Sequence, residues 1–335
     1  MARRATGTED EDISGAEFVR RYDLSEVDWK EKWDRIYINE KDKEKLINYG
    51  LLEQQLQAAS FDQMTLSRHG AVLLSGPPGT GKTTLAKGAA YKLAEEIDRE
   101  ALGLERVVFK QIEVRNLFSS DHGDTPKLVE EAFDRVIKGG QRGHTYQVVL
   151  LDEVESLFAN RGLLGDTDPM DAIRAVNTAL DCLDALSDLD NIYVIATSNQ
   201  PGAVDSAFVD RTDEQIYIGN PEPKHRRQIL EDIFTSLEEA FETQLSPTDE
   251  HIETLVRLSD GFSGRRMRKS VLSALARETS TVRDPATLSI DQLLREFKHK
   301  REMLDNAGND YIQLGVTPDQ PNDASNDNDQ EGATE

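Results

Sequence analysis

The residues best suited to chemistry in this sequence form one glycine-rich run. It consists of Gly76, Pro77, Pro78, Gly79, Thr80, Gly81, Lys82, Thr83 and Thr84. Glycines let a backbone curl so that its N–H groups point at phosphate oxygens, at the positive end of a following helix. Lys82 would reach the β- and γ-phosphates of a nucleoside triphosphate, and the Thr83 hydroxyl would ligate Mg²⁺. We therefore predict that this run binds the phosphates of ATP together with Mg²⁺.

Two adjacent acids, Asp152 and Glu153, follow an apolar run that ends at Leu151. Acids at the carboxyl end of a buried strand would lie beside the glycine-rich loop. Asp152 would hold Mg²⁺ through water, and Glu153 would polarise the attacking water as a general base. The alternative is a pair of solvated acids at a strand end, and the phosphate-binding run upstream favours the catalytic interpretation.

Three further polar residues have a functional and a structural interpretation each. Asn199 could orient the attacking water or contact the γ-phosphate, or it could simply form a turn before a Gln-Pro dipeptide. Arg211 could enter a neighbouring subunit's nucleotide site, or it could form a salt bridge to Asp210 or Asp213. Arg265, at the start of a predicted helix, could reach the phosphates, or it could be a surface arginine.

The elements that must position these residues alternate between strands and helices. Short apolar runs predict strands at 71–75, 105–113, 147–152, 191–197 and 215–218. Helical spacing predicts helices over 46–56, 82–92, 126–138 and 169–187. This alternation predicts an α/β fold with a parallel five-stranded sheet flanked by helices. After Pro221 only helices are predicted, at 223–242, 248–259, 264–278 and 288–305.

Composition divides the chain of 335 residues further. We expect a flexible N-terminal segment (1–28), a large nucleotide-binding domain (29–221), a small helical lid (222–306) and a disordered acidic tail (307–335). No apolar run approaches the roughly 20 residues that cross a bilayer, and the N-terminus has no secretory signal. A single cysteine, Cys182, fits a reducing compartment, so a cytoplasmic location is expected.

The order of these motifs resembles an AAA+ P-loop ATPase with a helical lid. Two runs narrow the resemblance, Asp171-Ala-Ile-Arg174-Ala-Val-Asn177 and Phe208-Val-Asp-Arg211-Thr-Asp213. They are similar to the pachytene-checkpoint AAA+ ATPases (the thyroid-receptor-interacting-protein 13 group), and the similarity spans about residues 33–304. The resemblance implies a homohexameric ring that partly unfolds HORMA-domain proteins, converting them from a closed to an open state.

The same resemblance assigns roles to the three uncertain residues. It implies that Asn199 is the first sensor, Arg211 the arginine finger and Arg265 the second sensor. In the first pore loop, Asp121 and His122 occupy positions that are usually aromatic in this family. The grip on a substrate chain would then depend on His122, or on Leu163 and Leu164 in a later loop.

Only about 30 residues precede Trp33, whereas eukaryotic members of the family carry a substantial N-terminal domain. Short members occur in prokaryotic CBASS antiphage operons, so the resemblance implies a role in antiphage regulation. The alternative is an AAA+ ATPase acting on a nucleic-acid-associated complex, of the clamp-loader or initiator type. The net charge of −24 argues against nucleic acid as a partner. A third possibility is a nucleotide-sensing scaffold without turnover.

Overall fold

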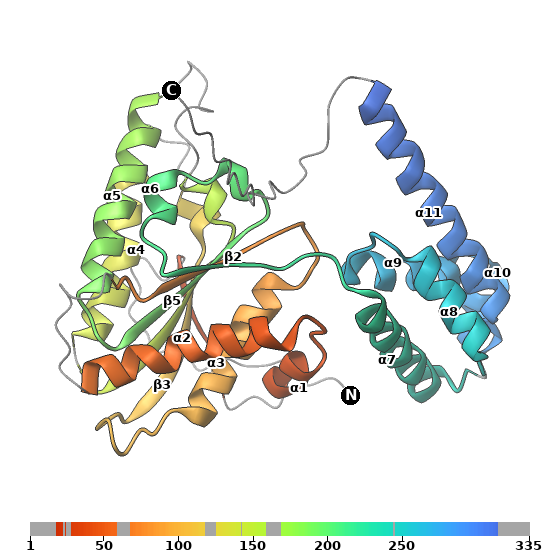
Figure 1. Cartoon of the computed structure of the whole chain (residues 1–335), viewed down its shortest axis with the longest axis horizontal. Coiled ribbons are helices and arrows are strands. Elements are labelled where there is room, and N and C mark those ends of the chain that lie inside the picture. The colour runs from red at the N-terminus through yellow and green to blue at the C-terminus, as the bar shows by residue number, and fades with distance from the viewer. Residues whose placement is uncertain are drawn as a thin grey trace, which may run out of the picture. The chain divides into compact units, whose positions relative to one another are not determined.

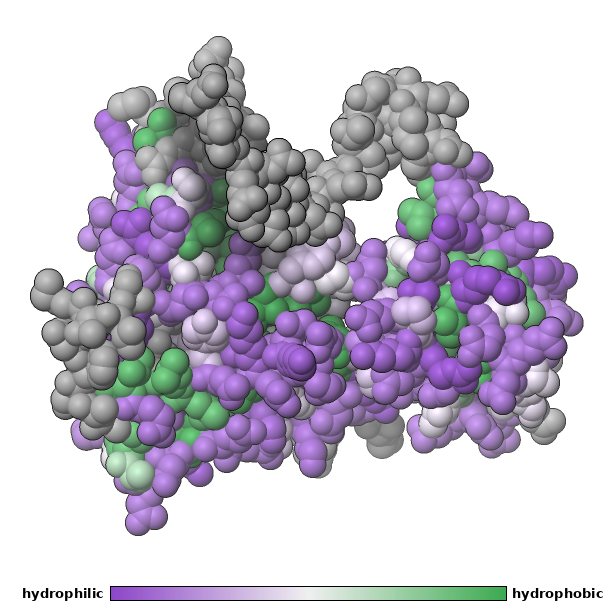
Figure 2. Space-filling model, viewed as in Figure 1, coloured by the Kyte–Doolittle hydropathy of each residue, from purple (hydrophilic) through white to green (hydrophobic). Residues whose placement is uncertain are grey.

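The computed structural model of this chain describes residues 18–22, 24, 28–58, 68–117, 125–141, 143–158, 169–243 and 245–313. Contacts divide the chain into two compact units, Met1–Leu237 with Gly261–Lys269 and Glu238–Asp260 with Ser270–Glu335. The domain boundaries predicted from the sequence stay predictions. Hydrophilic residues cover most of the face seen in Figure 2, in keeping with a charged-residue content of 30%.

A six-stranded sheet with the order β1-β3-β4-β5-β2-β6 forms the centre of the first unit. The strands are β1 (Val19–Tyr22), β2 (Ala71–Ser75), β3 (Arg106–Ile112), β4 (Thr145–Leu151), β5 (Ile192–Ser198) and β6 (Glu214–Tyr217). Strands β2 to β6 pair in parallel, and β1 pairs antiparallel with β3. The predicted α/β fold is therefore confirmed, with five parallel strands and one additional antiparallel strand at the edge.

Strand β1 corrects the expectation of a five-stranded sheet. It lies in the segment 1–28, which the sequence analysis expects to be flexible, and its sequence Val-Arg-Arg-Tyr is short and polar. Its register with β3 runs from Val19 opposite Ile112 to Tyr22 opposite Phe109. The Tyr22 ring lies 5.4 Å from the Phe109 ring, centroid to centroid. The strand thus depends on a tertiary partner that a polar tetrapeptide does not reveal.

Helices cover both faces of the sheet (Figure 1). One face carries α1 (Asp28–Asp34), α2 (Glu40–Ala58) and α3 (Lys82–Glu96), and the other carries α4 (Thr125–Gly140) and α5 (Pro169–Ser187). Alternate strand residues supply the two cores, so that Leu73 packs on the α4 and α5 side and Leu74 on the opposite side. Because both faces are covered, every residue of β2 is buried.

The remaining helices lie after β5 in the chain, and the first of them precedes β6. They are α6 (Ser206–Val209), α7 (Pro223–Phe241), α8 (Asp249–Leu258), α9 (Gly264–Arg277), α10 (Thr279–Arg283) and α11 (Ile290–Gln313). The predicted helices 223–242, 248–259 and 264–278 are confirmed to within one residue at each end. Helix α11 continues to Gln313, past residue 307 where the sequence predicts the start of a disordered tail. Among the described residues, no helix combines the length and the apolar character needed to cross a bilayer.

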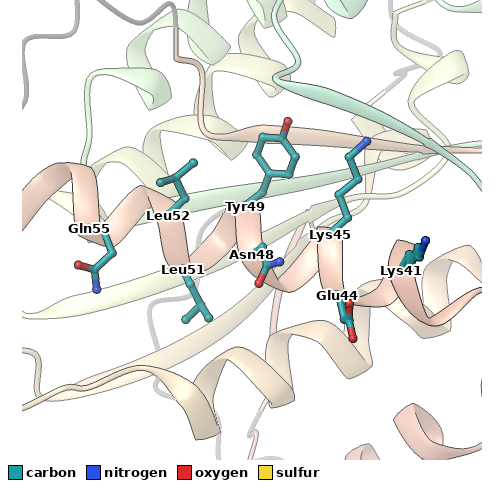
Figure 3. Close-up of a pocket in the computed structure, with 8 residues that line it drawn as sticks. All are labelled: Lys41, Glu44, Lys45, Asn48, Tyr49, Leu51, Leu52 and Gln55. Carbon is teal, nitrogen blue, oxygen red and sulfur yellow. The ribbon is translucent and has the colours of Figure 1, made fainter.

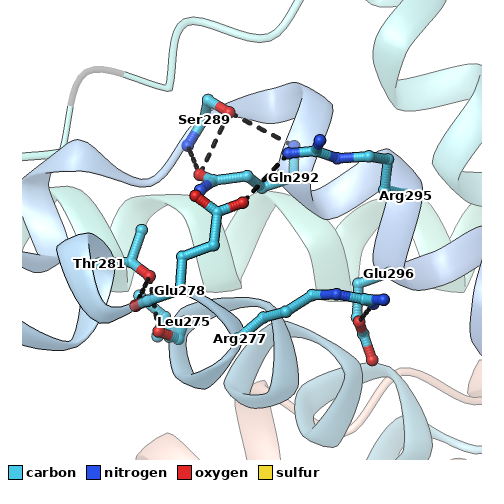
Figure 4. A network of polar contacts seen from close by, with 8 residues as sticks. All are labelled: Leu275, Arg277, Glu278, Thr281, Ser289, Gln292, Arg295 and Glu296. Atoms are coloured by element: carbon cyan, nitrogen blue, oxygen red, sulfur yellow. Dashed lines mark hydrogen bonds and ion pairs between the residues drawn. The ribbon is translucent and has the colours of Figure 1, made fainter.

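Polar contacts within the second unit hold the short helix α10, which the sequence does not predict (Figure 4). The hydroxyl of Thr281, a buried residue, donates to the backbone oxygens of Leu275 and Glu278, each at 2.8 Å. Arg277 forms an ion pair with Glu296, whose side chain is only 4% exposed. These contacts fix the chain between α9 and α11, where the local sequence alone shows only a break between two helices.

Candidate functional site

The glycine-rich run forms the loop between β2 and α3, as predicted. Gly76 has a φ of +139°, and a Cβ atom at this position would stand 2.2 Å from the backbone oxygen of Ile218. Gly79 has a φ of +84°, and its Cβ atom would lie 2.9 Å from the Ser263 hydroxyl. Both positions therefore require glycine, since L side chains rarely adopt such backbone angles and no space is left for them.

Lys82 opens α3 and is buried at 4% exposure. Its ammonium group donates to the backbone oxygens of Gly76 at 2.7 Å and Pro77 at 2.8 Å, both in its own loop. Burial lowers the pKa of this lysine to about 8, and the carboxylates of Glu155 and Asp152 oppose the shift. The loop thus holds a cation, at the N-terminus of a helix, where phosphate oxygens would bind.

Thr83 and Asp152, the two predicted Mg²⁺ ligands, lie in direct contact. The Thr83 hydroxyl donates to Asp152 Oδ1 at 2.8 Å. A residue that the sequence analysis missed, Thr197 at the end of β5, donates to the same oxygen at 2.6 Å and accepts the backbone N–H of Glu153 at 3.0 Å. Because β5 lies between β2 and β4 in the sheet, its carboxyl end meets both the loop and the acid pair.

Glu153 and Asn199, two of the predicted catalytic residues, are also brought together. The Asn199 side-chain amide donates to Glu153 Oε1 at 3.3 Å, and its backbone N–H donates to Glu155 Oε1 at 3.1 Å. Glu153 has left-handed backbone angles, φ 58° and ψ 54°, which are rare for a residue other than glycine. The acid and the amide therefore form one hydrogen-bonded group at the ends of β4 and β5.

Arg265 lies against the glycine-rich loop. Its backbone N–H donates to the Gly79 oxygen at 3.3 Å, and its Cβ atom stands 3.0 Å from where a Cβ on Gly79 would be. This position beside Gly79 agrees with the prediction that Arg265 reaches the phosphates, which stays a prediction.

Arg211 shares no hydrogen bond with the other predicted site residues of the described chain. Its guanidinium bonds to Asp184 of α5 at 2.7 and 2.9 Å and to the backbone oxygen of Ala207 at 2.9 Å. The sequence suggests Asp210 or Asp213 as the salt-bridge partner of Arg211, and this expectation is wrong because the partner is Asp184. Asp213 instead accepts the backbone N–H groups of His69 and Ala71.

A cavity of about 270 Å³ opens beside the glycine-rich loop within the first unit. Its loop side is formed by Gly79, Thr80, Gly81 and Thr84. The other lining residues are not predicted from the sequence as part of the site, and they are Lys32, Arg35, Ile36, Tyr37, Gly219, Pro221, Ile229, Gly264 and Arg268. Apolar and backbone groups with a few cations, next to a phosphate loop, suit the base and sugar of a nucleotide.

A second hollow, of about 560 Å³, runs along α2 (Figure 3). It shares no lining residue with the cavity beside the glycine-rich loop. Its lining residues are Lys41, Glu44, Lys45, Asn48, Tyr49, Leu51, Leu52 and Gln55. Lys45 and Tyr49 are both bonded to Glu214 of the edge strand β6, at 2.7 and 3.1 Å. Its polar groups thus attach α2 to the sheet, and we assign it no chemistry.

The family model for AAA, "ATPase family associated with various cellular activities", matches residues 72–220. CD-NTase-associated protein 6 of Pseudomonas aeruginosa is 33% identical over 288 residues, covering 85% of this chain and 92% of that protein. A pachytene checkpoint protein 2 homolog of Danio rerio is 33% identical over 301 residues, covering 82% of this chain and 69% of that protein.

Two solved structures share the fold. The Caenorhabditis elegans PCH-2 structure has a TM-score of 0.70 at 24% identity and covers 86% of this chain and 75% of that one. A chain of the "E. coli MS115-1 HORMA:CdnC:Trip13 complex" has a TM-score of 0.71 at 19% identity and covers 86% of this chain and 97% of that one. At these identities the likeness shows the fold alone. The predicted pore-loop residues, Asp121 and His122 with the alternatives Leu163 and Leu164, lie outside the described residues.

Proposed function

This chain belongs to the AAA ATPases of the pachytene checkpoint protein 2 group, and on that premise we propose that it uses ATP hydrolysis to remodel HORMA-domain proteins. The observation that carries the proposal is the 33% sequence identity between this chain and CD-NTase-associated protein 6, in an alignment that covers 92% of that protein. That relative is named for its association with a CD-NTase, and the E. coli complex contains HORMA and CdnC beside Trip13. We extend the proposal to closed-to-open conversion of a HORMA protein in CBASS-type antiphage signalling.

The chain, as an AAA ATPase, binds ATP. We propose that the phosphates lie in the loop from Gly76 to Thr84 and that the base and sugar lie in the adjoining cavity. Lys82 would exchange its bonds to the loop oxygens for bonds to the β- and γ-phosphates. This exchange is favourable because a phosphate oxygen carries charge and a backbone oxygen does not.

The contact between Thr83 and Asp152 suits a magnesium ion. Hydroxyl, carboxylate and phosphate oxygens are ligands that Mg²⁺ prefers, and it usually keeps several waters. We therefore propose that Thr83 binds the ion directly and Asp152 through water, once ATP supplies the remaining oxygens. Mg²⁺ would neutralise charge on the transferring phosphoryl group.

Glu153 and Asn199 are proposed to act on the attacking water. The Glu153 carboxylate would polarise the water and take its proton, while the Asn199 amide holds that carboxylate in place. Lys82 and Arg265 would stabilise negative charge on the γ-phosphate from the loop side.

Arg211 is proposed to serve a neighbouring subunit, since it bonds to none of the other site residues of its own chain. This role requires an oligomer, and we propose the homohexameric ring. A guanidinium that enters from a neighbour would make turnover depend on assembly.

The test of the function compares two possible stimulants of ATP turnover by the purified chain. A HORMA-domain protein, of the kind that the E. coli complex contains beside Trip13, should raise turnover and should change from its closed to its open state, as followed by size-exclusion chromatography. Lys82→Met supplies the control, because it should abolish both effects. Stimulation by DNA but not by the HORMA protein would favour the clamp-loader or initiator alternative. Absence of phosphate release under any condition would favour a nucleotide-sensing scaffold.

A further inference from the structure

Glu155 lies two residues after Glu153, in the turn Val154–Ser156, and its two carboxylate oxygens have different surroundings. Oε1 accepts the backbone N–H of Asn199 at 3.1 Å. Oε2 is buried and has no hydrogen-bond partner in the part of the chain that the structure describes. Burying a carboxylate oxygen without replacing its bonds to water costs free energy. A glutamate at this position therefore needs an explanation beyond packing.

Asn199 connects Glu155 to the proposed general base. Its backbone N–H bonds to Glu155, and its side-chain amide bonds to Glu153 Oε1 at 3.3 Å. Only two side-chain torsions separate the amide from the backbone, so a fixed backbone largely fixes the amide. The place of the Glu153 carboxylate thus depends on Glu155 through Asn199, the residue that directly follows the adjacent strand β5.

The backbone of Glu153 is held from another direction. Its left-handed conformation is supported by the bond from its N–H to the Thr197 hydroxyl at 3.0 Å. Rare backbone angles persist only where several contacts determine them. Thr197 therefore holds the Glu153 backbone, whereas Asn199 holds its carboxylate, and the second support is the one that requires Glu155.

Glu155 also lies near a cation, the ammonium group of Lys82. Among the charged groups around Lys82, Glu155 contributes most to opposing the lowering of the lysine's pKa by burial. A nearby buried cation compensates part of the cost of burying an unpaired carboxylate oxygen. Lys82 is thus a cation close to the Glu155 side chain, while the hydrogen bond to Asn199 indicates what Glu155 does.

We propose that Glu155 is a positioning residue for ATP hydrolysis, which holds the backbone of Asn199 so that the Asn199 amide orients the Glu153 carboxylate toward the attacking water. The inference rests on the proposed roles of Glu153 and Asn199. Glu155 acts through Asn199 and needs no contact with the nucleotide.

Two substitutions of similar length separate the hydrogen bond from packing. Glu155→Gln keeps an oxygen that accepts the Asn199 N–H, and Glu155→Met removes it while filling the space. We expect Glu155→Met to lower kcat about 100-fold, because misplacing a catalytic group by about 1 Å has an effect of that size. Glu155→Gln should stay within about threefold of the unmodified chain, and both variants should bind ATP within about threefold of its Kd. Amide hydrogen exchange at Asn199 should accelerate in Glu155→Met alone.

Asn199→Ala completes the experiment as a double-mutant cycle with Glu155→Met. Because Glu155 acts through Asn199, the double variant should be no slower than Asn199→Ala. The inference is overturned if Glu155→Met keeps its kcat, if Glu155→Gln is as slow as Glu155→Met, or if the two losses simply add. If Asn199→Ala itself keeps the unmodified kcat, the proposed catalytic assignment fails instead, so the two failures are distinguishable.

Discussion

Asp184 holds the guanidinium of Arg211 with both of its carboxylate oxygens. Arg211 Nε donates to Oδ1 at 2.7 Å, and Nη2 donates to Oδ2 at 2.9 Å. Nη1 donates to the backbone oxygen of Ala207 at 2.9 Å. These bonds occupy three of the five N–H groups that an arginine carries, which leaves one on each terminal nitrogen. The arginine is thus fixed in direction while part of its donor set stays available for a phosphate.

Removing either member of this pair tests the proposed arginine finger. Arg211→Ala should lower ATP turnover of the assembled protein at least about 100-fold, in line with the large effects of arginine fingers elsewhere. Asp184→Ala should lower turnover about tenfold, since the guanidinium remains but is no longer held in one direction. Steady-state phosphate release is measured at protein concentrations where analytical ultracentrifugation shows the same oligomer for each variant.

A second exposed ion pair supplies the control for charge removal. Asp134 and Lys138 lie 2.8 Å apart on α4, and their side chains are 47% and 69% exposed. Asp134→Ala should leave turnover unchanged, because such pairs contribute little. If Asp184→Ala hydrolyses ATP faster than the unmodified chain, Asp184 restrains Arg211 rather than positioning it, and our interpretation of the pair is wrong.

Glu153→Gln tests the assignment of the general base. The amide keeps the shape of the side chain but cannot accept a proton from water, so hydrolysis should fall at least about 100-fold. ATP binding should persist, because Glu153 follows β4 and is not part of the glycine-rich loop that is proposed to bind the phosphates. Rapid quench of a single turnover and the nucleotide content of the isolated protein measure the two effects separately. Rapid turnover in this variant would remove Glu153 from the mechanism.

Cys182 gives a test of burial in α5. Burial raises the pKa of its thiol to about 11, and nearby carboxylates such as Glu130 and Asp134 add to the shift. At pH 8 about 0.1% of the folded thiol is ionised, against about 20% in an unfolded chain, so iodoacetamide should label the folded protein at least about 100-fold more slowly. As pH rises, the thiol of the unfolded chain ionises before that of the folded chain. The contribution of the neutral thiol to the free energy of unfolding is therefore fully present below about pH 8.5 and is lost as pH rises through about 11.

Mass spectrometry follows this labelling directly, since the chain has one cysteine. Between pH 8 and 10 the rate for the folded protein should rise about tenfold per pH unit. Labelling of the folded protein within about tenfold of the denatured rate at pH 8 would show that the thiol is not held in its neutral form.

The sequence predicts the elements whose character is local. Strand β2 is predicted at 71–75, its observed bounds, because a strand buried on both faces is a continuous apolar run. Strand β1 is polar and exists through its pairing with β3, and α10 is one short helix held by contacts to its neighbours. Neither carries a periodic signal of its own, so neither could be predicted without the tertiary structure.

In the site too, residues that are contiguous in sequence can be predicted, whereas contacts between residues far apart in sequence cannot. The glycine-rich loop and the pair Asp152 and Glu153 are each contiguous in sequence, so their types and spacing are sufficient to find them. Asp184 lies 27 residues from Arg211, and adjacency in sequence favours the wrong partners. Glu155 is an acid only two residues after Glu153, and this spacing could have drawn attention to it, but its bond to Asn199 depends on two strands lying side by side.

Thr197 illustrates how a residue without a motif can join the parts of the site. It is 1% exposed, and its hydroxyl donates to Asp152 at 2.6 Å and accepts the Glu153 N–H at 3.0 Å. Thr197→Val preserves the volume but leaves the Glu153 N–H unpaired, which should lower the free energy of unfolding by about 1–3 kcal/mol. It should also lower ATP turnover about tenfold, because Asp152 and Glu153 both lose a contact. Thr197→Ser keeps the hydroxyl and should retain turnover within about threefold, as measured beside urea unfolding of each variant. Equal turnover in the valine and serine variants would show that the hydroxyl does not connect the two acids.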